Sequence, residues 1–187
     1  MIRLRNSHDE QAWGQFVDIY APLIHAYGLH HGQQDADAAD LAQEVLQAVA
    51  THAGRFDYDP RKGSFRGWLF AITRNKLCND LARRKNHPKA VGGTDMRRMI
   101  DEVPDELVSE EFWNQEHQRR LFHWAVERIR QDFQQTTWDA FWRTAVEEKT
   151  AAHVARELNI SVGAVYIARS RVLTRLRDEI GTVENPN

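Results

Sequence analysis

Several features that would assign this chain to a particular class of protein are missing from its sequence. Its 187 residues include a single cysteine, Cys78, so the chain can form neither an internal disulfide nor a cysteine-based metal cluster. No stretch approaches the roughly 18 consecutive apolar residues that span a bilayer. The chain begins with charged residues instead of an apolar signal segment. We therefore expect a cytoplasmic protein.

Motifs that carry catalysis or hold a cofactor are missing as well. The Gly92-Gly93 pair lacks the following Lys-Ser or Lys-Thr of a phosphate-binding loop, and we find no nucleophile elbow or paired-carboxylate site. The 9 histidines match no ligand spacing, since His30 and His31 are adjacent and so diverge on a helix. We expect no enzyme, no cofactor and no metal site.

Neither sign of charge dominates, since the formal net charge is −2, but the charges are unevenly distributed. Residues 55–89 contain ten basic and three acidic side chains, and residues 156–177 contain five and one. Between them, residues 95–116 contain eight acidic and two basic side chains. Any one charge run is as often a solvated helix face as a binding surface. Two basic regions around an acidic one favour two nucleic-acid-binding modules.

The spacing of apolar residues predicts an all-α protein. Apolar positions recur at helical intervals almost everywhere, and no sustained alternating strand pattern is present. Pro88 and the glycine pair after it interrupt the pattern. We predict two small helical domains joined by a linker, with a first domain at 1–88, an acidic linker at 89–108 and a second domain at 109–187.

Local signals predict where the helices of the first domain begin. Ser7, with a glutamate three residues on, forms a capping box for the first helix, and Pro22 predicts a bend or a break within it. The second helix is predicted to begin near Asp35 or Asp37. Ser64 is the expected cap of the third helix.

Residues 151–177 predict a helix, a tight turn and a second helix. Asn159 lies where such a turn requires a left-handed residue, and Ser161 can cap the second helix. The core of this motif is expected to consist of Val154, Leu158, Ile160, Val162 and Val165. An ordinary helical hairpin is the plainer alternative. The arginine-rich flank favours a helix-turn-helix that enters the major groove.

Three segments carry a resemblance to a known family. They are residues 37–49, the Arg55-Phe-Asp step and residues 63–75, which together resemble domain two of extracytoplasmic-function RNA polymerase sigma factors. The helix-turn-helix resembles domain four of the same family at the expected separation. The resemblance implies a protein that binds RNA polymerase core and directs it to promoters.

The resemblance also implies three sets of site residues. The polymerase core would be bound by Asp40, Leu41, Gln43, Glu44 and Val45. The non-template strand of the minus-ten element would be bound by Arg61, Lys62, Arg66, Trp68, Arg74, Asn75, Lys76, Asn79 and Arg83. The minus-thirty-five element would be read by Ser161, Gly163, Ala164, Tyr166, Ile167, Arg169, Ser170 and Arg171.

Some of these assignments remain open at the level of sequence. Trp68 either contacts melted DNA or packs against Leu41 and Val45. The family commonly has a lysine and further polar residues where this chain has Tyr166 and its two successors, so its promoter preference is open.

The resemblance names the partners as the clamp helices of the largest polymerase subunit, the polymerase flap and promoter DNA. Family members are often bound by an anti-sigma factor that covers their polymerase-binding surfaces. The resemblance therefore leaves open whether this chain has such a partner. The competing interpretation is a stand-alone helix-turn-helix regulator that binds duplex operators as a dimer. The whole N-terminal half argues against this interpretation, because it would then need another role.

Overall fold

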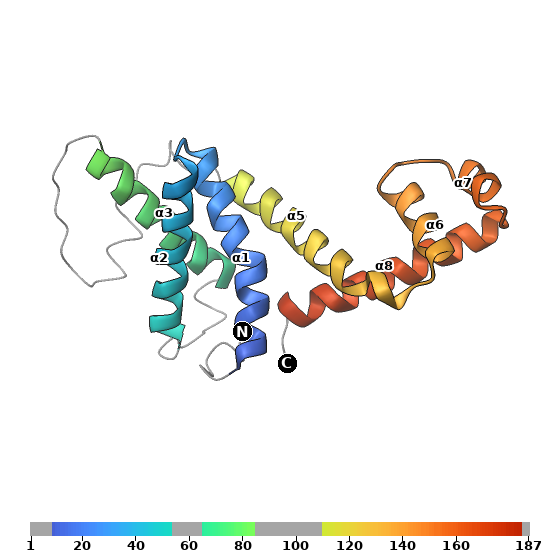
Figure 1. Cartoon of the computed structure of the whole chain (residues 1–187), viewed down its shortest axis with the longest axis horizontal. Coiled ribbons are helices and arrows are strands. Elements are labelled where there is room, and N and C mark those ends of the chain that lie inside the picture. The colour runs from blue at the N-terminus through green and yellow to red at the C-terminus, as the bar shows by residue number, and fades with distance from the viewer. Residues whose placement is uncertain (1–8, 54–64, 85–109, 185–187) are drawn as a thin grey trace. The chain divides into compact units, whose positions relative to one another are not determined.

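The computed structural model of the chain describes residues 9–53, 65–84 and 110–184, and every regular element in these ranges is a helix (Figure 1). The elements are α1 (Glu10–His30), α2 (Asp35–Ala53), α3 (Phe65–Arg84), α5 (Glu110–Ile129), the 3₁₀ turn η4 (Arg130–Asp132), α6 (Gln135–Ala145), α7 (Ala151–Leu158) and α8 (Val162–Glu184). The prediction of an all-α fold is confirmed.

The chain divides into two compact units, Met1–Arg120 and Leu121–Asn187. The division falls within α5, so the first turns of this helix belong with α1 to α3. The predicted linker at 89–108 lies outside the described residues. The predicted domain limits near residues 88 and 109 therefore stay predictions.

Helix α1 begins and continues differently from the sequence prediction. Its cap is Asp9, whose Oδ1 accepts a hydrogen bond from the backbone N–H of Ala12 at 3.0 Å, while Ser7 lies outside the described residues. The helix continues through Pro22, so the break does not occur, and of the two expected outcomes only the bend stays a prediction. An interior proline costs a helix about 3 kcal/mol. The full burial of Ile19 and Leu23 on either side offsets that cost.

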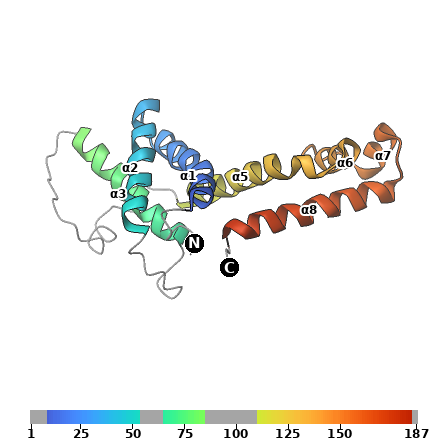
Figure 2. The same ribbon diagram turned by 60° about the horizontal axis from the view of Figure 1, so that its bottom comes forward.

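The core of the first unit joins its three long helices. Helices α1 and α2 lie side by side, with α3 packed against α2 (Figures 1 and 2). The most completely buried aliphatic side chains are Ile19, Leu23, Ile24, Leu41, Val45, Val49, Leu69 and Leu77. Gly28 permits a close approach between the end of α1 and the start of α2. A Cβ there would lie 3.1 Å from the Cβ of Ala38 and 2.5 Å from Oε1 of Gln33.

The first turns of α5 cover an aromatic surface of the first unit. Trp113 is 1% exposed, and its ring meets those of Tyr27 and Phe70 at centroid distances of 5.4 Å each. The ring of Phe112 stacks on His30 at 3.9 Å. The sequence pattern grouped Phe112 and Trp113 with the second domain, whereas their rings pack on helices of the first unit.

The second unit contains the predicted helix-turn-helix in α7 and α8. Asn159 adopts the left-handed conformation at φ 53° and ψ 48°, and Oγ of Ser161 accepts from the N–H of Ala164 at 3.1 Å, as predicted. Its buried core consists of Ala140, Val154, Ala155, Val165 and Ala168, packed with Ala151, Leu158 and Ile160. Val162 is 42% exposed, so its prediction as a core residue is wrong. It lies one residue beyond the cap and takes no part in the buried cluster of the motif.

Candidate nucleic-acid interface

One face of α8 presents almost all the residues predicted to read the upstream promoter element. Ser161, Gly163, Tyr166, Ile167, Arg169, Ser170 and Arg171 are exposed, and Ala164 is half-buried. The opposite face of the helix is buried through Val165, Ala168, Val172 and Leu176. This separation follows from helical periodicity, because positions 3 and 4 apart lie on the same side. The exposed face is therefore free to enter a groove.

The arginines of α8 differ in whether they form ion pairs with carboxylates. Arg175 is engaged, since its Nε lies 3.0 Å from Oδ2 of Asp132 and its Nη1 lies 2.8 Å from Oε2 of Glu179. Within the described parts of the chain, Arg169 and Arg171 are exposed and form no ion pair. The two arginines predicted to bind DNA are thus available to phosphates, as is Arg177, which is also exposed and forms no ion pair within the described residues.

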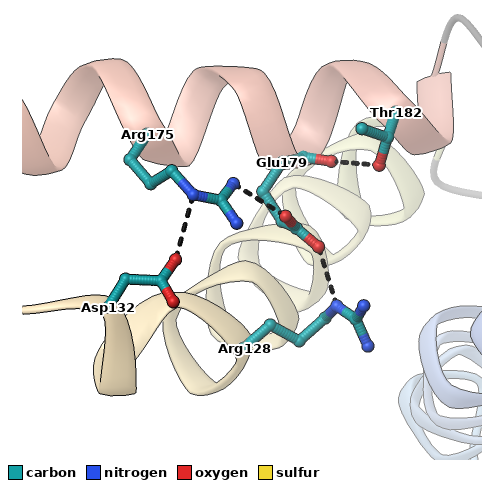
Figure 3. Close-up of polar contacts among 5 residues, drawn as sticks. All are labelled: Arg128, Asp132, Arg175, Glu179 and Thr182. Atoms are coloured by element: carbon teal, nitrogen blue, oxygen red, sulfur yellow. Dashed lines mark hydrogen bonds and ion pairs between the residues drawn. The ribbon is translucent and has the colours of Figure 1, made fainter.

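A buried carboxylate anchors the second half of α8 to the preceding helices (Figure 3). Oε1 of Glu179 accepts from Nε of Arg128 in α5 at 2.7 Å, and its other oxygen accepts from Arg175. Burial alone would raise the pKa of Glu179, but the hydrogen bonds from the two arginines outweigh it and hold that pKa below its usual value. Glu179 therefore stays ionised and positions the helix that carries the exposed face.

A second ion-pair group joins α6 to α7 at the surface. Glu157 accepts from Nη1 of Arg143 at 2.8 Å and lies 2.9 Å from Nε2 of His153. The hydrogen bond from Arg143, aided by Lys149 and His153, holds the pKa of Glu157 below its usual value. The sequence analysis missed this group and Glu179. Helical spacing could have indicated His153–Glu157 and Arg175–Glu179, which are i,i+4 pairs, but not the contacts of Arg143 and Arg128 from other helices. Thr174 was also missed, although it follows Gly163, Ile167 and Ser170 at helical intervals on the exposed face.

The residues predicted to bind the minus-ten strand are distributed around α3. Asn79 and Arg83 are exposed, while Arg66, Trp68, Arg74 and Lys76 are half-buried. Asn75 is only 8% exposed, beside the fully buried Thr73, so its amide would have to become accessible before it could read a base. The ring of Trp68 contacts that of Phe65 at 5.4 Å. Arg61 and Lys62 lie outside the described residues.

The residues predicted to bind polymerase core divide into two groups on α2. Asp40, Gln43 and Glu44 are exposed, whereas Leu41 and Val45 are 2% and 0% exposed and belong to the core of the unit. Oε2 of Glu44 lies 2.9 Å from Nζ of Lys76, so residues expected to serve two different ligands contact each other. Only the polar members of the set form an accessible surface.

The described residues were also compared with what a metal site or a membrane-spanning helix requires. In the described ranges, no group of three or more histidine, cysteine or carboxylate side chains is arranged to hold a metal ion. No helix among those residues is long and apolar enough to cross a membrane.

Comparison with known proteins agrees with this geometry. The family described as Sigma-70 region 2 matches residues 16–87, which include most of α1 and all of α2 and α3. The chain is also 26% identical over 180 residues to the ECF RNA polymerase sigma factor RpoE of Cereibacter sphaeroides. That alignment covers 96% of this chain and 92% of the relative, so it includes the helix-turn-helix. Together, the region 2 match and this relative support an extracytoplasmic-function sigma factor.

As a sigma factor, the protein acts in promoter-directed transcription initiation, with RNA polymerase core and promoter DNA as its partners. The basic stretch at 55–89 includes α3, and the basic stretch at 156–177 includes the end of α7 and most of α8. The family match and the exposed face of α8 thus lie in different units of one initiation factor.

Proposed function

We propose that this sigma factor uses three separate surfaces during initiation. Asp40, Gln43 and Glu44 on α2 bind the clamp helices of polymerase. The exposed side of α3, with Arg83 and Asn79, holds the melted minus-ten strand. The exposed face of α8 reads the minus-thirty-five duplex. The proposal places residues 1–88 as sigma domain two and 109–187 as sigma domain four, acting in the cytoplasm where polymerase and chromosome meet.

The separation of exposed and buried residues on α8 is the observation that carries the proposal. A helix with its side chains is about 10–12 Å across and fits the major groove, which is about 12 Å wide. Ser161 caps the end that would enter the groove, and Thr150 caps α7 by accepting from the N–H of His153. The motif therefore presents a rigid helix end whose exposed side chains have no role in the core.

For polymerase core, the exposed side of α2 offers acidic and amide groups to a basic partner. Side chains at positions 40, 43, 44 and 47 repeat at helical spacing and are all exposed. Leu41 and Val45 support this face from beneath and do not form part of it. An anti-sigma factor that covers these residues would compete with core for the same surface.

For the polymerase flap, the second unit offers an open groove of about 510 Å³ between α5 and α6. It is lined by Val126, Glu127, Arg130, Gln135, Trp138, Asp139 and Trp142. Trp138 and Trp142 stack at 6.0 Å, and the guanidinium of Arg130 lies 5.0 Å from the Trp138 ring. Amphipathic helices bind such grooves through apolar anchors. We propose that a flap helix docks here.

The decisive experiment is run-off transcription from a genomic promoter library with purified bacterial core polymerase, with and without the protein. New transcripts that share a two-part promoter motif are the expected result. Arg171→Ala should weaken upstream docking by roughly tenfold and lower the salt dependence of binding by about one phosphate contact, while core binding is unchanged. Duplex binding without core association would instead support a stand-alone regulator.

A further inference from the structure

Among the described residues, the two most exposed large apolar side chains are neighbours on α8. Tyr166 is 59% exposed and Ile167 is 62% exposed, whereas the other exposed large apolar residues lie between 38% and 43%. Single exposed apolar residues are common on protein surfaces and need no explanation. Two adjacent ones in the first turns of a recognition helix, facing away from its core, indicate a contact.

The position of this pair on the helix identifies the surface that it would meet. Each residue advances about 100° around an α-helix. Gly163 therefore lies between Tyr166 and Ile167 on the exposed face, and Ser170 follows one turn later. Arg169 and Arg171 are separated by about 200° and so lie on opposite borders of this strip. A central strip bordered by two unpaired arginines matches a groove with a phosphate backbone on each side.

The side chains of the strip exclude bidentate hydrogen bonding to guanine or adenine. Bidentate recognition needs an arginine or lysine for guanine, or an asparagine or glutamine for adenine. None of these residue types occurs at positions 163, 166, 167 or 170. The one apolar group that a base presents in the major groove is the C5-methyl of thymine. Gly163 has no side chain, and a Cβ there would meet nothing nearer than Oγ of Ser161 at 3.9 Å, so space remains for a base edge.

We propose that Tyr166 and Ile167 determine promoter specificity by contacting thymine methyl groups in the upstream element. The inference rests on the proposed DNA-reading role of α8 and adds the chemical group that is read. The arginines on both borders favour a polyanion over an apolar protein surface as the occupant. Each methyl buried against an apolar side chain should strengthen binding roughly fourfold, from about 0.8 kcal/mol per buried carbon.

The test begins with selection of upstream elements by the holoenzyme. Each thymine in the selected element is then replaced by deoxyuracil, which removes only the methyl group, and holoenzyme binding to the duplex is measured. We expect a roughly fourfold loss at one or two positions. Ile167→Ala or Tyr166→Ala should abolish the difference between thymine and uracil at one position each. Val146→Ala, which truncates an exposed apolar residue outside α8, should preserve the difference.

A second measurement separates methyl contact from hydrogen bonding to the rest of the base. Replacing the sensitive thymine by cytosine should weaken binding, and 5-methylcytosine should recover part of the loss because it restores the methyl at the same ring position. Equal binding of thymine and uracil duplexes, or a selected element without thymine on either strand, would overturn the inference. If α8 does not read the upstream element at all, the experiments would give a different result. Initiation would then need no upstream element, and Arg169→Ala with Arg171→Ala would leave it unchanged.

Discussion

Lys76 on α3 and Glu44 on α2 form an ion pair across 2.9 Å. The sequence assigned the lysine to DNA phosphates and the glutamate to polymerase, yet each is already neutralised by the other in the free protein. The side chains are 27% and 54% exposed, so the pair contributes at most about 1 kcal/mol to stability. Such a pair can open without much cost when a ligand competes for either partner.

Exchanging the charges of Glu44 and Lys76 tests whether Glu44 contacts polymerase core or serves only the internal ion pair. Glu44→Lys should weaken binding to polymerase core about tenfold, because it places a positive charge against a basic surface. The double variant Glu44→Lys with Lys76→Glu restores the internal pair but not the contact with core. We expect it to bind core as weakly as the single variant in a fluorescence anisotropy titration. Recovery of affinity in the double variant would show that the pair matters only for the fold.

His117 should make the stability of the first unit depend on pH. Burial, reinforced by the positive charge of Arg66, lowers the pKa of His117 to about 4, and its Nε2 lies 3.3 Å from Oη of Tyr20. The unfolded chain binds this proton near pH 6.5, so stability is constant above that value. It falls as pH drops from 6.5 towards 4, by about 3 kcal/mol at most.

Urea unfolding followed by circular dichroism between pH 7.5 and 4 measures this dependence. His117→Gln cannot be protonated and should flatten the profile. His123→Gln is the matched control, because that imidazole is exposed on the same helix and its removal should leave the profile unchanged. An unaltered profile in His117→Gln would remove this histidine as the cause.

Glu179 should matter more to stability than any other member of its ion-pair group. Glu179→Ala leaves Arg128 and Arg175 without their shared acceptor and should destabilise the second unit by about 2 kcal/mol. Asp132→Ala removes a surface pair to Arg175 and should cost less than about 1 kcal/mol. Thermal unfolding of the full chain compares the two. An equal loss in both variants would contradict the anchoring role of Glu179.

Asn159 should tolerate glycine but not alanine. Its φ of 53° is left-handed, and this conformation costs an ordinary L-residue about 1–2 kcal/mol. We therefore expect Asn159→Ala to lower the free energy of unfolding by about 1 kcal/mol and Asn159→Gly to be nearly neutral. Chemical denaturation of both variants measures the difference. If alanine is tolerated as well as glycine, the turn relaxes to another conformation.

The helix-turn-helix shows what can be predicted from sequence. Asn159 and Ser161 act through hydrogen bonds and backbone angles within a few residues of themselves, so their roles could be inferred from the order of residues. The direction of the exposed face of α8 follows from the same periodicity. Val162 was misplaced because a residue at the first helical position can face either way, and only packing against α7 decides which.

Contacts between distant residues could not be predicted in this way. Asn75 is polar and lies on a helix expected to bind DNA, yet its neighbours in space bury it. Trp113 followed the apolar pattern of the second domain, but its ring fills a space between Tyr27 and Phe70 in the first unit. The partner of an apolar or charged side chain depends on how the helices pack.

The sequence by itself determined the helical class, the turn at Asn159, the distribution of basic residues and the resemblance to sigma factors. These features depend on composition and on interactions within a few residues along the chain. Only the tertiary structure decided that Glu44 pairs with Lys76, that Glu179 anchors α8 and that the first turns of α5 join the first unit. Such pairings depend on which surfaces folding brings together, because burial and charge act through distance in space and not along the chain.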